Sequence, residues 1–220
     1  KNKTNLICEK SRKKVVEKAI KNNFDVVIFD DGLQDRSINY DLKIVCFDTE
    51  NWIGNGYLIP SGPLREKIDS LKKYDIIFLK GECFNEEKIF RLIKDQNPEI
   101  KVFQTYYEAV NLNKFNVKND YLIFSGIGNP NNFRNTLIKN NFNIVDEIIF
   151  PDHYEYKQED IEKIKFTAKK LNAKIITTEK DYVKLSGKDT DNIDFLEIDL
   201  RIKNERDLIN FINPLINEKY

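Results

Sequence analysis

Two adjacent carboxylates, Asp30 and Asp31, follow a run of four apolar residues and precede Gly32. P-loop enzymes place a carboxylate at the end of such an apolar strand, where it holds Mg²⁺ beside a triphosphate. Ligands of open α/β sheets also collect at this end of the strands. Asp and Gly are equally favoured in turns, so a plain turn is the alternative interpretation. The segment therefore predicts either a turn or a metal-binding acid pair.

A second candidate is a loop that ends in Leu64, Arg65 and Glu66. From residue 54 onward it holds three of the eight glycines and two of the six prolines of the chain. Such a backbone is stiff at its prolines and can approach a ligand closely at its glycines. Arg65 could clamp phosphate oxygens with its planar guanidinium, and Glu66 could ligate a hard cation. A structural loop whose Arg-Glu pair opens a helix is the alternative.

His153 is the single histidine of the chain and follows an apolar run, a proline and Asp152. An imidazole in that position could take or give a proton near neutral pH. A surface or structural histidine is the alternative. Downstream, Thr178 and Asp181 have the spacing of a helix-capping box, which is the simplest explanation of that motif.

These candidates need a scaffold, and the hydrophobic pattern predicts one of the α/β class. Short apolar runs alternate with amphipathic helical segments, which is typical of parallel sheets covered on both faces. We expect two α/β/α lobes with largely parallel sheets, at residues 1–108 and 109–220, separated near an Asn- and Lys-rich segment. The predicted strands are residues 25–31, 42–48, 74–79, 102–107, 121–124, 144–150, 174–177 and 195–198.

Composition excludes several classes of protein. Basic and acidic residues number 36 each, which argues against a surface built for nucleic acid. A hydrophobic content of 40% with 12% aromatics argues against a disordered chain. Apolar runs stay far below the ~18 residues of a membrane-spanning helix.

Five sequence blocks, taken in order, resemble the tetraacyldisaccharide 4'-kinases of lipid A biosynthesis. The blocks are VIFDDGLQ at 27–34, GNGYLIPSGPLRE at 54–66, SGIGNPNNF at 125–133, FPDH at 150–153 and TEKD at 178–181. Each is modest alone, but their order and spacing are specific and span nearly the whole chain. Asp35 departs from the pattern, since the family commonly has His after the Gln.

The resemblance implies a P-loop-type kinase that moves the γ-phosphate of ATP to the 4'-hydroxyl of a tetraacylated disaccharide 1-phosphate, with Mg²⁺. It implies catalytic roles for His153, Asp31 and Arg65, with His153 forming a dyad with an Asp. It also implies a nucleotide site that comprises Asp30, Asp31, Gly32, Gln34 and Arg65, and metal ligation by Asp30 and Glu66. The implied setting is the cytoplasmic face of the inner membrane, to which the enzyme binds peripherally.

No P-loop occurs in the sequence, because its one Gly-Lys pair, Gly187-Lys188, is followed by Asp189. We expect the P-loop, the dyad Asp and a membrane-binding helix to lie upstream, within on the order of 100 residues. The chain alone is then expected to be a soluble, monomeric and inactive portion of the enzyme.

Two other classes remain open at this level. Residues 28–33 echo the opening strand of haloacid-dehalogenase-type phosphatases, but that chemistry needs acids two residues apart, on one side of the strand end. Asp30 and Asp31 are adjacent and would point to opposite sides of a strand. A non-catalytic α/β binding module is the second alternative, which the missing P-loop favours.

Overall fold

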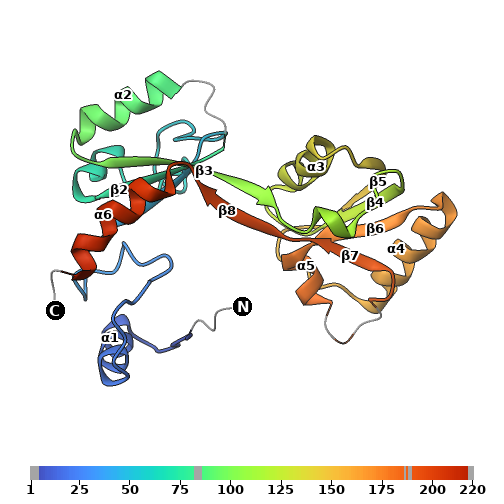
Figure 1. Ribbon diagram of the computed structural model, residues 1–220, viewed down its shortest axis with the longest axis horizontal. Helices are drawn as coiled ribbons and strands as arrows, with labels where there is room; N and C mark the ends of the chain where they lie inside the picture. The colour runs from blue at the N-terminus through green and yellow to red at the C-terminus, as the bar shows by residue number, and fades with distance from the viewer. Residues whose placement is uncertain (1–4, 82–85, 186, 188–189, 218–220) are drawn as a thin grey trace. The chain divides into compact units, whose positions relative to one another are not determined.

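The computed structural model of the chain describes residues 5–81, 86–185, 187 and 190–217 (Figure 1). Lys188 and Asp189 lie outside the described residues. Unit 1 comprises residues 1–106 and 201–220, and unit 2 comprises residues 107–200. The chain passes from unit 1 to unit 2 within β3 (Lys101–Ala109) and returns within β8 (Ile198–Ile202).

The sheet of unit 1 has four strands in the order β1 (Ile44–Asp48), β2 (Ile76–Lys80), β3 and β8. The first three are parallel, and Ile76 pairs with both Ile44 and Lys101. The 3₁₀ helix η1 (Ile68–Lys73) and the helix α2 (Glu86–Gln96) connect these strands. The parallel arrangement expected from the sequence is thus confirmed here.

Alternation along β2 explains why helices cover both faces of this sheet. Ile77 and Leu79 point to one face and pack with residues of η1 and α2, including Ile93. Ile76 and Phe78 point to the other face, where apolar residues of α6 (Glu205–Asn217) pack. α6 continues through Pro214 to Asn217, so the proline does not end the helix.

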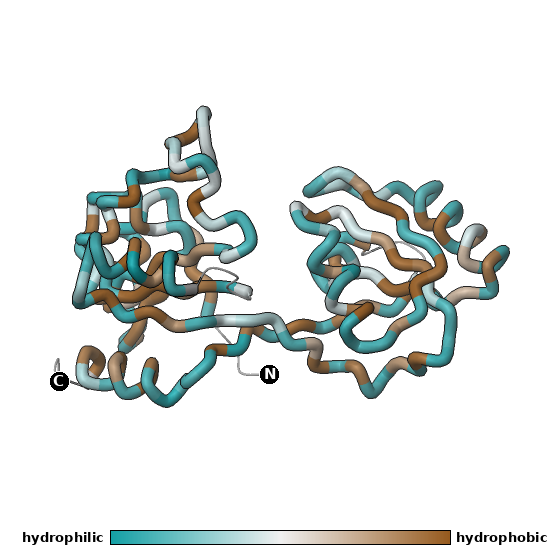
Figure 2. Tube along the Cα trace, turned by 90° about the horizontal axis from the view of Figure 1, so that it is seen from above, coloured by the Kyte–Doolittle hydropathy of each residue, from teal (hydrophilic) through white to brown (hydrophobic). Residues whose placement is uncertain are grey.

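The sheet of unit 2 is parallel throughout, in the order β5 (Asn143–Ile149), β4 (Asp120–Ser125), β6 (Lys174–Thr178) and β7 (Ile193–Leu196). Successive residues of β4 again alternate. Phe124 packs with Ile161 and Ile164 of α4 (Gln158–Leu171), and Ile123 packs with Leu137 of α3 (Pro130–Lys139). The tube in Figure 2 shows hydrophobic residues along the strands and a mixture of hydrophilic and hydrophobic residues along the helices.

Two shorter helices complete unit 2. The 3₁₀ helix η2 (Leu112–Lys114) lies between β3 and β4, and α5 (Glu179–Lys184) follows β6 directly. Asn129 and Thr178 are the N-caps of α3 and α5, and each side chain accepts a hydrogen bond from a backbone N–H of the first turn. These caps place the beginning of each helix at the carboxyl end of a strand.

One predicted strand is wrong. Residues 25–31, which the pattern predicts as a strand, form none, and Val26 and Ile28 are exposed, with Ile28 almost fully so. A strand requires ladder hydrogen bonds to a neighbour, and β1, at the edge of the described sheet, pairs only with β2. The preceding helix forms as α1 (Arg12–Lys21), but Ala19 is its single buried residue.

The expected division of the chain also needs a correction at its C-terminal end. The sequence pattern assigns this segment to the second lobe, whereas the structure places residues 201–217 in unit 1. The reason is that β8 lies beside β3, while Leu208 and Phe211 of α6 pack on β2 and β3. Among the described residues, no helix combines the length and apolar character that a bilayer span requires.

Candidate functional site

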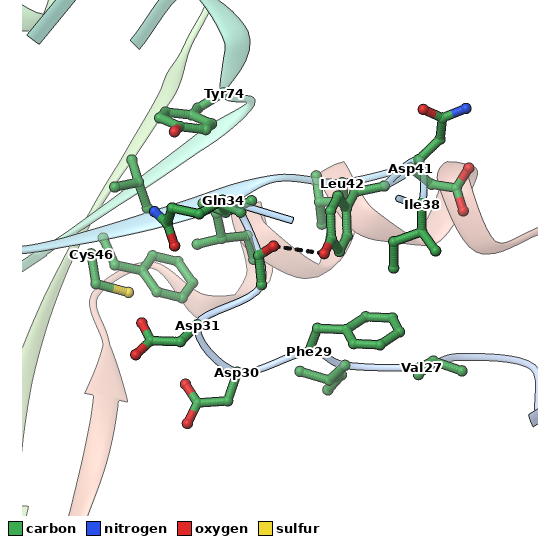
Figure 3. Close-up of a pocket in the computed structure, with 18 of the residues that line it drawn as sticks. Val27, Phe29, Asp30, Asp31, Gln34, Ile38, Asp41, Leu42, Cys46 and Tyr74 are labelled. Atoms are coloured by element: carbon green, nitrogen blue, oxygen red, sulfur yellow. Dashed lines mark hydrogen bonds between the residues drawn. The ribbon is translucent and has the colours of Figure 1, made fainter. Parts of the chain in front are cut away.

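The DDG segment lies in a turn that lines a cavity of about 990 Å³ in unit 1 (Figure 3). The hydroxyl of Tyr40 donates a hydrogen bond of 2.7 Å to the carbonyl oxygen of Gly32. A Cβ at Gly32 would lie 3.0 Å from both the Tyr40 hydroxyl and the Cβ of Phe29. Glycine therefore allows the close approach that this turn requires.

Arg12 and Asp35 hold the far side of the same turn. Arg12 donates from Nη2 to the carbonyl oxygen of Asp31 at 2.9 Å and from Nη1 to Oδ2 of Asp35 at 3.0 Å. The backbone N–H of Ser37 donates to Oδ1 of Asp35 at 2.8 Å. Hydrogen bonds from Ser37, and then from Arg12, lower the pKa of Asp35 to about 2. Asp35 thus orders the backbone behind the acid pair.

Arg65 reaches the acid pair from a segment 34 residues away. Its Nη1 donates to Oδ1 of Asp31 at 2.8 Å. The side chains of Arg65 and Asp31 are 58% and 69% exposed, so this ion pair can be exchanged for another ligand at little cost. Figure 3 shows the carboxylates of Asp30 and Asp31 projecting toward one side of the turn. The expectation that they point to opposite sides assumed a strand, which the structure does not contain here.

Glu66 lines the same cavity and interacts with Tyr74. Burial, and then the hydrogen bond and negative charge of Glu66, raise the pKa of Tyr74 to about 12. The carboxylate of Glu66 is therefore hydrogen-bonded to the Tyr74 hydroxyl.

The donor set fits a hard cation in part. Among the described residues, no three His, Cys, Asp or Glu side chains are grouped as metal ligands. Mg²⁺ commonly takes only one or two carboxylates from the protein and its other ligands from water and phosphate. Asp30 and Asp31, side by side on an exposed turn, suit that mode of binding. Burial, and then the negative charge of Asp30, raise the pKa of the Cys46 thiol nearby.

The candidate residues of unit 2 follow the carboxyl ends of its parallel strands. The segment after β4 leads through α3 to β5 on one side, and the segment after β6 leads through α5 to β7 on the other. The ends of β4 and β6 therefore flank the switch point of the sheet, where open α/β folds bind ligands.

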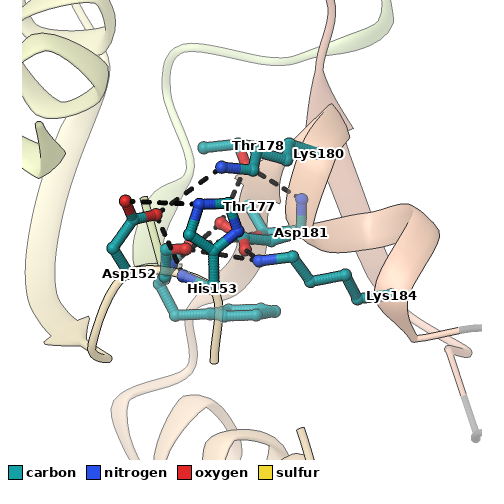
Figure 4. Close-up of polar contacts among 9 residues, drawn as sticks. Asp152, His153, Thr177, Thr178, Lys180, Asp181 and Lys184 are labelled. Atoms are coloured by element: carbon teal, nitrogen blue, oxygen red, sulfur yellow. Dashed lines mark hydrogen bonds and ion pairs between the residues drawn. The ribbon is translucent and has the colours of Figure 1, made fainter. Parts of the chain in front are cut away.

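A buried carboxylate joins these two segments (Figure 4). Asp181 accepts hydrogen bonds from the backbone N–H of Gly126 at 2.9 Å and from the hydroxyl of Thr178 at 2.8 Å. Lys184 donates to Oδ1 of Asp181 at 2.8 Å. Burial, and then the charge of Asp181, raise the pKa of the adjacent Tyr156. The sequence indicated only a capping box here, and the bond to Gly126 has no signal in the local pattern.

His153 lies in the turn after β5, exposed and with a left-handed backbone at φ 60°. The backbone N–H of His153 donates to Oδ1 of Asp152 at 2.9 Å, and the imidazole Nε2 lies 3.7 Å from Oδ2. Lys180 places Nζ 3.5 Å from Oδ1 of Asp152. Desolvation acts to raise the pKa of Asp152, but the charges of His153 and Lys180 outweigh it and lower that pKa.

The structure thus brings most of the predicted site residues to one place. A single cavity in unit 1 is lined by Asp30, Asp31, Gly32, Gln34, Arg65 and Glu66. His153 belongs to unit 2. Sequence patterns do not indicate Arg12 and Tyr40, because neither lies within a recognisable motif.

Comparisons with known proteins agree on one family. A family model described as tetraacyldisaccharide-1-P 4'-kinase matches residues 1–217. A tetraacyldisaccharide 4'-kinase of Pelagibacter ubique is 46% identical over 207 residues, which cover 93% of this chain and 65% of that protein. One of Rickettsia bellii is 41% identical over 180 residues, covering 81% of this chain and 54% of that protein. The chain therefore spans between about half and two thirds of these relatives' length.

A solved structure supports the fold. LpxK from Aquifex aeolicus, described in complex with ATP, aligns with a TM-score of 0.64 at 22% identity. The alignment covers 93% of this chain and 62% of that one. Neither the phosphatase alternative nor the non-catalytic module is favoured by any of these matches. The chain belongs to the tetraacyldisaccharide-1-P 4'-kinase family.

Proposed function

We propose that this chain serves the ATP-dependent transfer of a phosphate to the 4'-hydroxyl of a tetraacyldisaccharide 1-phosphate in lipid A biosynthesis. The observation that carries the proposal is the ion pair between Arg65 and Asp31, which joins two family motifs on one cavity wall. Family membership supplies the reaction class, since the curated relatives are named as kinases of this substrate.

Arg65 is the residue that binds the transferring phosphate. Its exposed guanidinium is held ready by Asp31 and can exchange that carboxylate for phosphate oxygens with similar fork geometry. Phosphoryl transfer depends mainly on positioning and on stabilising negative charge, and an arginine supplies both. Gln34 and Gly32, on the same cavity wall, border the nucleotide.

Mg²⁺ would be held by Asp30, with Asp31 beside it. When bound, the ion neutralises charge on the phosphates and fixes their orientation. Glu66 is the less suitable ligand, because its carboxylate already contacts the hydroxyl of Tyr74.

His153 acts as general base toward the 4'-hydroxyl. As the oxygen forms its bond to the γ-phosphorus and the bond to the leaving diphosphate oxygen breaks, the hydroxyl proton passes to the imidazole. The exposed ring and the neighbouring carboxylate of Asp152 suit this role, because the carboxylate stabilises the protonated imidazole.

The setting of the reaction is part of the same proposal. The enzyme works as a monomer at the cytoplasmic face of the inner membrane, which it contacts peripherally, and it binds no nucleic acid. The 220 residues alone do not turn over, because their sequence holds no P-loop to cradle the nucleotide. Detectable 4'-phosphorylation by the 220 residues alone would contradict that last point.

The test is transfer of ³²P from γ-labelled ATP to tetraacyldisaccharide 1-phosphate. The protein assayed contains these 220 residues and is as long as the relatives that they match. His153→Asn is the sharpest variant, because Asn tolerates the left-handed backbone but cannot act as a base. We expect kcat to fall by about 10²–10⁴-fold, while the KM for ATP stays near that of the wild type.

The control is Lys163→Ala on the exposed surface of α4, which should leave both constants unchanged. Unchanged turnover of His153→Asn would exclude His153 as the base. Absence of transfer by the wild-type protein would reject the function as a whole.

A further inference from the structure

A run of three exposed apolar side chains lies just before the Arg65 motif. Tyr57 and Ile59 are 65% and 62% exposed, and Leu58 between them is also exposed. Among the described residues this is the longest consecutive run of exposed large hydrophobic side chains. Single exposed apolar residues are ordinary on protein surfaces, whereas clusters of them mark interaction sites. We call residues 57–59 the apolar tip.

The apolar tip is held in place by its own backbone. Ile59 N–H donates to the carbonyl oxygen of Leu64 at 2.9 Å, and Leu64 N–H donates to that of Tyr57 at 3.2 Å. The N–H groups of Ser61 and Gly62 both donate to the carbonyl oxygen of Leu58, at 2.9 and 3.0 Å. Since these bonds fix the main chain, the three side chains are presented to solvent by an ordered loop.

The interior of the loop is closely packed around Gly62 and Asn55. A Cβ at Gly62 would lie 2.4 Å from the carbonyl oxygen of Tyr57 and 2.2 Å from Oδ1 of Asn55. The Asn55 side chain also donates to the carbonyl oxygen of Ser61 at 2.8 Å and accepts from Tyr57 N–H at 3.1 Å. The loop therefore cannot fold its apolar side chains inward without breaking these contacts.

The apolar tip is continuous with the candidate site. The backbone of Leu64 is hydrogen-bonded to that of Tyr57 and Ile59 in the tip. Leu64 is buried and lines the same cavity as its neighbour Arg65. Arg65 and Lys67 are exposed beside it and supply positive charge. One loop thus presents an apolar surface next to cations, which complements an amphiphile with a phosphorylated head and acyl chains.

We propose that residues Tyr57, Leu58 and Ile59 bind acyl chains of the lipid substrate while Arg65, on the same loop, faces its polar head. This inference rests on the proposed function, because that function supplies an acylated substrate. Burial of the apolar tip against hydrocarbon removes its exposed area from water. Tyr57 suits the boundary, since its ring is apolar and its hydroxyl can stay hydrated.

Co-sedimentation with vesicles tests the proposal without ATP, so its outcome does not depend on phosphoryl transfer. The probe is phosphatidylcholine vesicles that contain tetraacyldisaccharide 1-phosphate, compared with phosphatidylcholine alone. The test variant is Tyr57→Asn with Ile59→Asn, which leaves every backbone hydrogen bond of the loop available. We expect it to bind the substrate-containing vesicles about tenfold more weakly than the wild type, or worse.

Two matched variants keep the test specific. Phe166→Asn with Val183→Asn removes side chains of similar exposure, 72% and 68%, from unit 2 and should bind as the wild type does. Tyr57→Phe with Ile59→Val keeps the tip apolar and should also retain binding. Thermal unfolding should be the same for all of these proteins.

Several results would overturn the proposal. Equal binding by the wild type and the Asn double variant, or no binding by either, excludes the apolar tip as the contact. If the wild type binds vesicles of phosphatidylcholine alone as tightly as it binds the substrate-containing vesicles, the apolar tip contacts bilayers in general and not this substrate. Equal competition by the deacylated disaccharide 1-phosphate excludes the acyl chains, and a change of oligomeric state in the Asn variant assigns the tip to self-association.

Discussion

Each unit of the molecule contains an ion pair whose carboxylate belongs to a family motif, and the two pairs are built in opposite ways. In unit 2, Asp181 is fully buried and is bound by Lys184, Thr178 and the backbone of Gly126. In unit 1, Asp31 and Arg65 meet in solvent at a turn. The motifs looked alike in sequence, as short polar runs after apolar ones, yet only one of them became part of a core.

The difference indicates two kinds of work. A buried carboxylate with every oxygen bonded is costly to disturb, so it fixes the segments after β4 and β6 relative to each other within unit 2. An exposed pair contributes little to folding and remains free to exchange partners. We therefore expect substitutions in unit 2 to act on stability, and substitutions at the Arg65–Asp31 pair to act on chemistry.

The largest effect is expected for Asp181→Ala. The substitution leaves the Lys184 ammonium and the Gly126 N–H without their buried acceptor, at a cost of about 3–5 kcal/mol in the free energy of unfolding. Urea unfolding followed by circular dichroism measures the loss, and hydrogen exchange of residues 120–125 locates it in unit 2. Asp181→Asn, which keeps one oxygen, should lose less.

The exposed pair provides the matched control. Arg65→Ala should change the free energy of unfolding by less than about 1 kcal/mol, while it lowers phosphoryl transfer. If Arg65→Ala destabilised the protein as much as Asp181→Ala does, the distinction between the two pairs would be lost.

A smaller contrast compares the helix caps of the two units. The Thr178 hydroxyl accepts a hydrogen bond from the backbone N–H of Asp181 at 3.1 Å and donates one to the Asp181 carboxylate. Thr178→Ala should therefore lower the free energy of unfolding by about 1–2 kcal/mol. Ser11 caps α1 with a longer bond of 3.4 Å, and α1 buries only Ala19. Ser11→Ala should therefore cost about 0.5 kcal/mol or less. Equal losses in thermal unfolding would contradict the comparison.

Much of the fold could be predicted because hydrophobic period and strand alternation are local. The apolar run of β4, which packs through Ile123 on one face and Phe124 on the other, is present in the sequence itself, as is the capping box at Thr178. The motif around Arg65 was found for the same reason, since its glycines and prolines stand out in composition.

The rest depended on contacts that no local pattern encodes. Residues 26–29 have the apolar character of a strand, but pairing is a property of two segments, and in the structure they have no ladder. The return of α6 to unit 1 follows from its packing on β2, which is distant in sequence. Arg12 was missed because its two acceptors, the Asp31 carbonyl and the Asp35 carboxylate, lie about 20 residues away along the chain.

The smallest expected effect is on the pH dependence of stability, and it concerns two carboxyl groups with lowered pKa values, Asp35 in unit 1 and Asp152 in unit 2. Hydrogen bonds lower the pKa of Asp35 from 3.8 to about 2, so its contribution to stability is complete above pH 3.8 and is lost as the pH falls toward 2. The free energy of unfolding should therefore depend less on pH in Asp35→Asn than in the wild type over this range. Urea unfolding at pH 2, 3, 4 and 5 measures the difference.

Asp152 in unit 2 completes this comparison. Its pKa is lowered by the charges of His153 and Lys180 acting against desolvation, so its contribution is likewise lost toward acid pH. Salt screens charges between exposed groups far more than it weakens short hydrogen bonds. Added NaCl should therefore diminish the difference between the wild type and Asp152→Asn, while the Asp35→Asn difference persists. If salt removed both equally, the turn of unit 1 would be held by charge, as the turn of unit 2 is, and the hydrogen bonds of Ser37 would not explain it.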